Sequence, residues 1–129
     1  MGTEIEIESE TLSLLDKYCN PKIRPARLGA ILSVIISQWY ARAAKAWTEK
    51  PELIPHLEKI PESRKQKVMT TTTHGKAFKK TLEAFNKKMN TNIGEAELVT
   101  WLTKTYIKAF RIKQKTKGYK FVMGGIKRV

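Results

Sequence analysis

The sequence predicts an all-α protein, a helical bundle of about four to five helices with an acidic N-terminal arm and an extended basic C-terminal tail. Three observations lead to this fold class. Apolar residues recur at helical spacing through the middle of the chain, prolines and glycines separate these stretches, and the charges are segregated toward the two ends. With 129 residues, 41% of them hydrophobic and 29% charged, the chain is expected to form a single folded domain over residues 1–129.

The start of the chain, MGTEIEIESE, is predicted to be an acidic arm over residues 1–10. Residues 1–16 contain five acids and no base, whereas residues 104–129 contain nine bases and no acid. Two interpretations fit this polarity: the acidic start of one subunit contacts the basic end of another, or both ends are solvated arms. We expect the acidic arm to be ordered only in an assembly.

The first long helix is expected from Pro25 to about Lys50, because proline suits the first helical turn. The apolar residues of this stretch share one arc at about 100° per residue: Leu28, Leu32, Ile35, Ile36, Trp39, Ala43 and Trp47. A narrow sector beside that arc is polar and cationic: Arg24, Arg27, Gln38, Arg42 and Lys45. The helix is therefore predicted to have an apolar side and a cationic side.

Prolines punctuate the next segment, PELIPHLEKIP, which is expected to form short turns as a linker across the core. A further helix is expected to start at Pro61, in PESRKQKVM. The run TTTTHG is expected to interrupt this helix, because successive β-branched threonines followed by Gly75 are poor helix formers. His74 would then lie in the break.

Two more helices are expected, each with an apolar and a basic side. From Gly75 to about Met89 the apolar stripe is Phe78, Leu82, Phe85 and Met89, and the opposite side carries Lys76, Lys80 and Lys87. Asn92, with Glu95 three residues later, resembles an N-cap signal for the last helix. Its inward residues are Leu98, Val99, Leu102, Tyr106, Ala109 and Phe110, and its far edge carries Lys104, Lys108, Arg111 and Lys115. The glycine-containing basic tail, residues 116–129, is expected to be extended or β-like.

The charge balance indicates a nucleic-acid partner. Twenty-five Lys and Arg against 12 Asp and Glu give a formal charge of +13 and a pI near 10.0. The cations are spread over several segments, whereas binding to a membrane surface would favour one basic amphipathic helix. The longest apolar run, AILSVII, is too short to span a bilayer, and the single cysteine, Cys19, excludes an internal disulfide framework.

No catalytic constellation is visible in the sequence, so we expect no enzyme activity and no cofactor. His56, His74 and Cys19 match no zinc-ligand spacing. The acids form no paired set for magnesium, and the chain has no phosphate-cradling glycine loop of the GxxxxGK[ST] kind.

The basic helix sides are the strongest functional signal. Solvated helices normally mix Glu with Lys, because like charges four residues apart destabilise a helix, but these basic faces are predicted to lack acids. Phosphates lying between such cations would remove this repulsion and release counterions. The candidate nucleic-acid-binding residues are Arg24, Arg27, Arg42, Lys45, Lys76, Lys80, Lys87, Lys104, Lys108, Arg111 and Lys115. Long lysine-rich faces suit backbone contact, so binding independent of base sequence is expected.

Aromatic residues offer two further interpretations. Trp39, Trp47 and Trp101 lie at or near inward arcs and are expected to pack in the core, although base stacking is an alternative. Tyr119 and Phe121 alternate with lysines in the tail, so they are candidates either for base stacking or for packing between subunits.

Two stretches carry a family resemblance. CNPKIRPARLGAILSVI, an Asn-Pro turn leading into an Ala/Leu/Ser/Val helix, and the terminal GGIKRV lie in a helical chain of about this size. This layout resembles the major coat proteins of filamentous archaeal viruses with linear double-stranded DNA, of the rudivirus, lipothrixvirus and tristromavirus types. The resemblance covers the layout of the chain and no diagnostic motif.

The resemblance implies a helical fold whose N-terminal helices contact the DNA duplex, while the remaining helices form a bundle on the outside of the filament. The partners would be double-stranded DNA in an A-like form, other copies of the chain and a paralogous coat protein. The protein would belong to a virion assembled in the host cytoplasm. Arg24, Arg27, Arg42 and Lys45 would be the main phosphate contacts, helped by the cations of the last helix; the acidic start departs from this pattern.

Other functions remain open at this point. A small helical accessory subunit of an RNA-guided defence complex would prefer single strands or a guide complex. A chromatin-like or regulatory DNA-binding dimer would bind duplex without forming long filaments. A membrane-surface protein would bind liposomes without nucleic acid.

Overall fold

The computed structural model describes residues 2–18, 25–117, 119–122 and 125–128, with side chains for 2–18 and 28–109. The protein is mostly helical, as predicted, but it also contains two small two-stranded antiparallel sheets, so the prediction of an all-α fold is confirmed only in part. In chain order the elements are β1 (Thr3–Glu8), α1 (Ser9–Tyr18), α2 (Pro25–Gln38), the π-helical segment η1 (Trp39–Ala43), α3 (Ala44–Glu49), the 3-10 turns η2 (Pro51–Leu53) and η3 (Glu62–Arg64), β2 (Lys65–Thr70), α4 (Thr72–Met89), α5 (Glu95–Lys117), β3 (Tyr119–Val122) and β4 (Gly125–Arg128).

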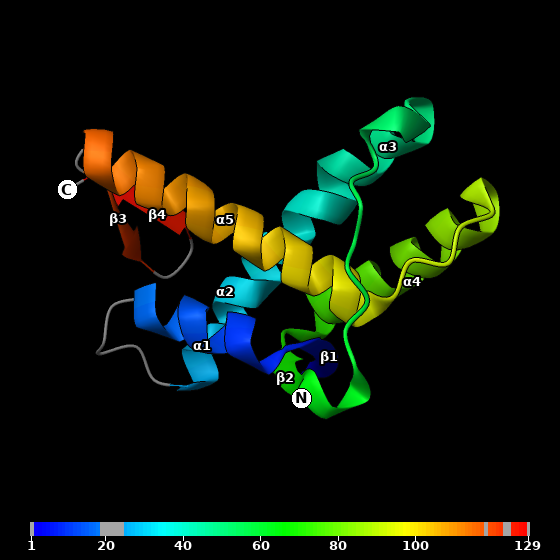
Figure 1. Cartoon of the computed structure of the whole chain (residues 1–129). Helices are drawn as coiled ribbons and strands as arrows, with labels where there is room; N and C mark the ends of the chain where they lie inside the picture. Colours follow the sequence, from blue (N-terminus) through cyan, green and yellow to red (C-terminus); the bar gives the residue numbers. More distant parts are fainter. Residues whose placement is uncertain (1, 19–24, 118, 123–124, 129) are drawn as a thin grey trace.

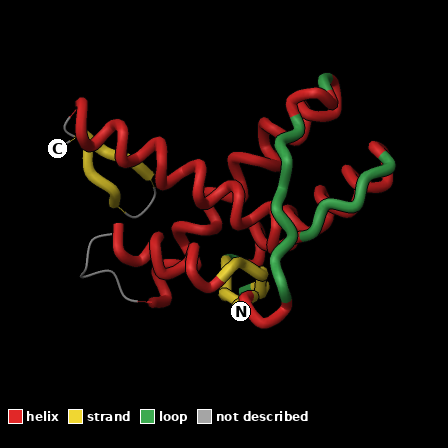
Figure 2. The backbone as a smooth tube through the Cα atoms, viewed as in Figure 1, coloured by secondary structure: helices red, strands yellow, loops and turns green. Residues whose placement is uncertain are grey.

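Helix α5 is the central element of the fold. It runs across the molecule above α1 and crosses α2, and it contacts β1, α1 and α2 (Figure 1). Helices α3 and α4 project at the right of the view, and residues 54–61 run as a loop from the end of α3 down across α5 (Figure 2). Ile60, which is buried, donates its backbone N–H to Glu97 Oε2 at 2.8 Å. The predicted linker across the core is thus tied to α5.

The predicted acidic arm is a strand of the core. In TEIEIE, Ile5 and Ile7 are 0% exposed, while the three glutamates that alternate with them lie on the opposite face of the strand. Strand β1 pairs with β2 in antiparallel register, from Thr3 opposite Thr70 to Glu8 opposite Lys65. The expectation that this segment is ordered only in an assembly is therefore wrong, because its isoleucines are buried within one chain.

The other edge of β1 is covered by α5. The backbone N–H of Glu6 donates to Glu95 Oε2 at 2.9 Å, and that of Glu8 donates to Thr100 Oγ1 at 3.0 Å. Amides two residues apart point to the same edge of a strand, so a carboxylate and a hydroxyl satisfy two successive donors. An unpaired strand edge can pair with another chain. The side chains of Glu95 and Thr100 occupy this edge of β1 and so oppose such pairing.

The helix predicted to start at Pro61 is not formed. The chain makes the turn η3 and then the strand β2. Thr70 is 3% exposed, and its hydroxyl donates to the carbonyl oxygen of Thr3 at 2.7 Å. Pairing with β1 outweighs the weak helical preference of KQKVMT, since tertiary contacts regularly override local propensity.

The threonine run also differs from its prediction, because α4 begins at Thr72 and includes His74 and Gly75. Gly75 lies where the helix packs against the sheet. A Cβ atom at this position would come within 2.6 Å of both Thr3 Cβ and Thr70 Oγ1. The glycine therefore permits close approach of helix and sheet and does not break the helix.

The predicted helix from Pro25 to about Lys50 is present as α2, η1 and α3, with a π-helical turn in its middle. Its expected inward tryptophans are confirmed as core residues: Trp39 is 0% exposed and Trp47 6%. Their rings form an edge-to-face cluster with Phe85, with centroid distances of 5.9 Å between the two tryptophans and 5.7 Å from Trp39 to Phe85. Trp101, on α5, joins this cluster through Trp47 at 5.7 Å.

A tight turn joins α4 to α5. Asn90 adopts a left-handed conformation (φ 55°) just after α4, a usual way to end a helix. The Asn86 side chain donates to the carbonyl of Ile93 at 2.9 Å and accepts from the hydroxyl of Thr91 at 2.8 Å. Helix α5 then starts at Glu95, three residues after the predicted cap at Asn92.

The basic tail is partly helical and partly β. Helix α5 continues to Lys117, beyond the predicted start of the tail, and β3 and β4 then pair as an antiparallel hairpin with Tyr119 opposite Arg128. The extended backbone expected for this tail agrees with these strands. Figure 1 shows them beside the C-terminal part of α5. Among the described residues, no helix is both long and apolar enough to cross a membrane.

Candidate nucleic-acid interface

The α4 lysines form the clearest basic face. Lys76, Lys80 and Lys87 are all exposed and lie within about 40° of one another around the helix axis. Phe78 and Phe85, on the opposite side, are buried at 0% and 4% exposure. The predicted division of this helix into an apolar and a basic side is confirmed. We call Lys76, Lys80 and Lys87 the α4 basic face.

One acid interrupts this face. Glu83 is exposed and lies on the same side of α4, between Lys80 and Lys87 in the sequence. It forms no ion pair within the described part of the chain. Its charge lowers the net positive charge of the face, which was expected to contain no acid.

The structure describes the side chains of only two of the four cations predicted on the long N-terminal helix. Arg42, in the π-helical segment, and Lys45, in α3, are both exposed, as their predicted sector requires. Arg24 lies outside the described residues, and Arg27 lies in α2 with its side chain outside them. The structure therefore places one arginine and one lysine of this predicted site on the surface.

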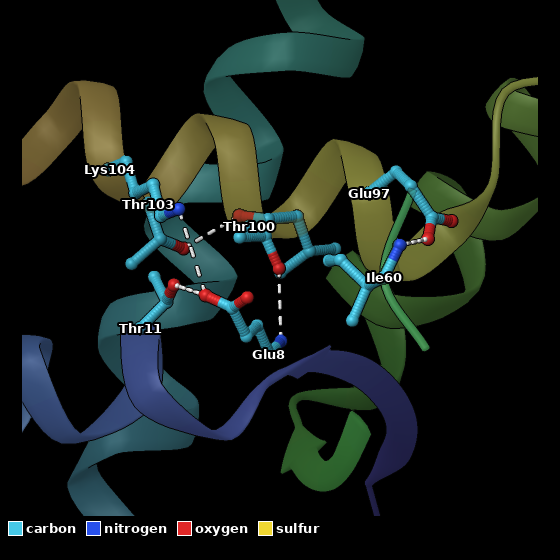
Figure 3. Close-up of polar contacts among 8 residues, drawn as sticks. Glu8, Thr11, Ile60, Glu97, Thr100, Thr103 and Lys104 are labelled. Atoms are coloured by element: carbon cyan, nitrogen blue, oxygen red, sulfur yellow. Dashed lines mark hydrogen bonds and ion pairs between the residues drawn. The ribbon is translucent and has the colours of Figure 1, made fainter. Parts of the chain in front are cut away.

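The structure describes the side chains of two of the four cations predicted along the far edge of α5. Lys104 and Lys108 are exposed, whereas Arg111 and Lys115 belong to α5 with side chains outside the described residues. Lys104 is also engaged within the chain: its Nζ lies 3.7 Å from Glu8 Oε1 (Figure 3). The acidic start and the basic end thus meet inside one subunit, which neither of the two interpretations of the charge segregation anticipated.

Ion pairing separates the remaining candidates from the structural cations. The described residues contain three ion pairs: Lys65–Glu62, Lys79–Glu95 and Lys104–Glu8. The exposed candidates that form no ion pair with any described residue are Arg42, Lys45, Lys76, Lys80, Lys87 and Lys108. These six side chains remain available to an external anion.

Three basic positions were not anticipated: Lys65, Lys67 and Lys79. Lys65 and Lys67 lie on β2 opposite Glu8 and Glu6, so cross-strand pairing places lysines beside the glutamates of β1. Lys79, adjacent to the α4 basic face, lies 3.5 Å from Glu95. Only a prediction of the strand pairing could have identified Lys65 and Lys67, because their partners are distant in the sequence.

The aromatic alternatives are resolved for the tryptophans. Burial of Trp39 and Trp47 removes both as platforms for stacked bases, and Trp101 packs on Trp47. Tyr119 and Phe121 lie in β3, with side chains outside the described residues, so their role remains a prediction.

A polar pocket of about 260 Å³ lies between the end of β1, the 56–64 segment and α5. Two of its three carboxylates are committed to the fold: Glu8 Oε1 accepts from the Thr11 hydroxyl at 2.7 Å, and Glu97 Oε2 accepts from the Ile60 amide (Figure 3). Lysines and an arginine from the same elements balance them, including Lys59. A lining of mixed charge such as this gives no clear charge preference for a ligand.

The groups that could support catalysis are dispersed. His56 is exposed on the loop, whereas His74 hydrogen-bonds through Nδ1 to the hydroxyl of Tyr40. Among the residues that the structure describes, no cluster of three or more His, Cys, Asp or Glu side chains could hold a metal ion. The arrangement therefore offers cationic helix faces on the described part of the chain.

Comparisons with protein-family models, with curated proteins and with solved structures gave no match for this chain.

Proposed function

We propose that this protein binds double-stranded DNA through phosphate contacts, without reading base sequence, and that many copies do so side by side as a coat. The observation that carries the proposal is the α4 basic face. Lys76, Lys80 and Lys87 share one exposed side of a helix and form no ion pair with described residues. Phosphates that neutralise such a face release condensed counterions, which is the main driving force of non-specific binding.

The other exposed, unpaired cations extend this binding surface. Arg42 and Lys45 come from the π segment and α3, and Lys108 comes from α5, so several elements can contribute phosphate contacts. Lysines on helix faces act as point charges with flexible stems, which suits backbone contact better than base recognition. Lys104 contributes less, because Glu8 already neutralises part of its charge.

The coat role rests on the resemblance to coat proteins of filamentous archaeal viruses together with the high net charge of +13. A chain with this charge repels its own copies unless a polyanion lies between them. Linear duplex DNA would supply that polyanion along its whole length. Virion assembly with a paralogous coat protein is part of the same proposal.

A salt series tests the binding mode. Duplex DNA binding is measured by fluorescence anisotropy at increasing salt for the wild type and for the triple variant Lys76→Gln, Lys80→Gln, Lys87→Gln. Loss of about three phosphate contacts should reduce the slope of log K against log salt by about 2 to 3. The matched control replaces three exposed lysines outside the candidate set: Lys17→Gln, Lys50→Gln and Lys59→Gln.

An equal loss of slope in both triple variants would reject the assigned face and leave only a general charge effect. Electron microscopy tests the coat role separately. Regular filaments of constant width on long linear duplex, and none on single strands, are expected. Preference for single strands would contradict the proposal and favour an accessory subunit of an RNA-guided complex.

A further inference from the structure

An apolar groove of about 440 Å³ lies between the long N-terminal helix and α5. One wall is formed by Ile35, Trp39 and Ala43, and the other includes Leu102 and Ala109. The alanines leave room that larger side chains would fill. Its volume falls in the range of about 300 to 1,000 Å³ that is typical of small-molecule sites, which are mostly apolar with a few placed polar groups.

The π-helical turn forms part of this wall. Trp39, Arg42 and Ala43 all belong to η1 and all line the groove. A π turn inserts an extra residue into a helix and is intrinsically less stable than an α turn, and such turns frequently occur at functional sites. The least regular part of the long helix therefore coincides with the groove.

The groove has one cationic side chain in its lining, Arg42, beside the neutral polar side chains of Gln38, Thr105 and Tyr106. Arg42 is exposed and has no ion pair with any described residue. The indole Nε1 of Trp39 is buried and finds no hydrogen-bond acceptor among the described residues. Both groups can only donate hydrogen bonds. Trp39 is 0% exposed, so Arg42 is the donor that a ligand in the groove can reach, and beside an arginine a negatively charged acceptor is preferred.

We propose that this groove binds an apolar carboxylate, of the medium-chain fatty-acid class. The hydrocarbon lies on Ile35, Trp39 and Leu102, and the carboxylate lies against Arg42. This assigns Arg42 a role that its neighbour Lys45 does not share, because Lys45 is exposed outside the groove lining. The inference does not require DNA binding, whose main contact surface is the α4 basic face, although Arg42 is shared by the two proposals.

Titration calorimetry with decanoate, below the concentration at which it forms micelles, tests the proposal. One decanoate per chain is expected to bind, and decanol and decyltrimethylammonium are expected to bind at least about tenfold more weakly, because the charged hydrogen bond to Arg42 is lost. Arg42→Gln should weaken decanoate binding by about tenfold or more, while the matched variant Lys45→Gln should leave it within about twofold.

A second pair of variants tests the location. Ala109→Phe should fill the groove and abolish decanoate binding, whereas Ala84→Phe, at an exposed position of α4 outside the lining, should preserve it. Circular dichroism confirms that both variants fold. Absence of decanoate binding or equally tight binding of decanol would overturn the proposal. Equal effects of Arg42→Gln and Lys45→Gln on decanoate affinity would also overturn it. A failure of DNA binding alone would leave it intact.

Discussion

Glu8 and Lys104 join the first strand to the last long helix, with 3.7 Å between Glu8 Oε1 and Lys104 Nζ. The two partners differ in their surroundings. The Glu8 side chain is 13% exposed and that of Lys104 is 52% exposed. The carboxylate is therefore held by the fold, while the ammonium group lies mostly in water, and the two residues should respond differently to substitution.

Replacing Glu8 by Ala should destabilise the protein by about 1 to 3 kcal/mol, because it removes the acceptor of a buried hydroxyl. That hydroxyl belongs to Thr11, which is 0% exposed. Lys104→Gln should cost less than about 1 kcal/mol, as is usual for a solvated ion pair. Urea unfolding of both variants measures the difference, and equal losses would contradict the asymmetry.

Glycine at position 29 should be essential to the contact between α2 and β2. A Cβ atom there would lie 1.8 Å from the carbonyl oxygen of Met69, and a backbone atom cannot move aside as a side chain can. Gly29→Ala should therefore cost about 3 kcal/mol or more, although alanine normally favours a helix. Gly75→Ala, which meets side-chain atoms at 2.6 Å, should cost less. Thermal unfolding checks this order, and a gain in stability from Gly29→Ala would refute the close contact.

A single substitution in α5 should expose one backbone amide on the edge of β1 to solvent. Thr100 is 5% exposed and accepts the N–H of Glu8. Thr100→Val preserves shape and removes this acceptor, so hydrogen exchange of the Glu8 amide should accelerate by about tenfold, which corresponds to one lost hydrogen bond. The Glu6 amide, bonded to Glu95, is the internal control and should change little. Equal acceleration at both amides would indicate general loosening of the strand.

Stability at alkaline pH should depend on Tyr40. Burial raises the pKa of its hydroxyl above the ordinary value of 10.0. The folded state therefore holds this proton more tightly than the unfolded state does. The stabilising contribution is complete below the unfolded pKa and is lost as pH rises through the folded one. Unfolding free energies between about pH 8 and 11 should fall less steeply for Tyr40→Phe than for the wild type. Parallel curves of unfolding free energy against pH for the two proteins would contradict this expectation. The variant also loses the hydrogen bond to His74, which lowers its stability by the same amount at every pH in this range.

Helix faces could be predicted well because the helical period fixes which residues face the core. Leu32, Trp39, Phe78 and Leu98 were assigned inward and are each 0% exposed. The same period places the α4 lysines on the solvent side. The exposure of the described candidate cations was therefore predictable from local spacing alone.

The sheet was missed for physical reasons. TEIEIE carries a period-two pattern, but its glutamates suggested a solvated arm, and its partner KQKVMT is too polar to indicate a strand by itself. Each strand becomes stable only when the other is present. For the same reason the ion pair of Lys104 with Glu8, and the groove that Leu102 shares with Trp39, depend on contacts between distant segments and have no local signal.

The position of β1 also determines the order in which the chain can fold. As the polypeptide leaves the ribosome, Ile5 and Ile7 emerge long before β2 and α5, the elements that pair with β1 and cover its edge. Non-local pairing of this kind is slow, so apolar, aggregation-prone segments stay exposed while synthesis continues. The alternating glutamates then act as gatekeepers, because their mutual repulsion hinders nascent chains from pairing with one another before their own partners have been made.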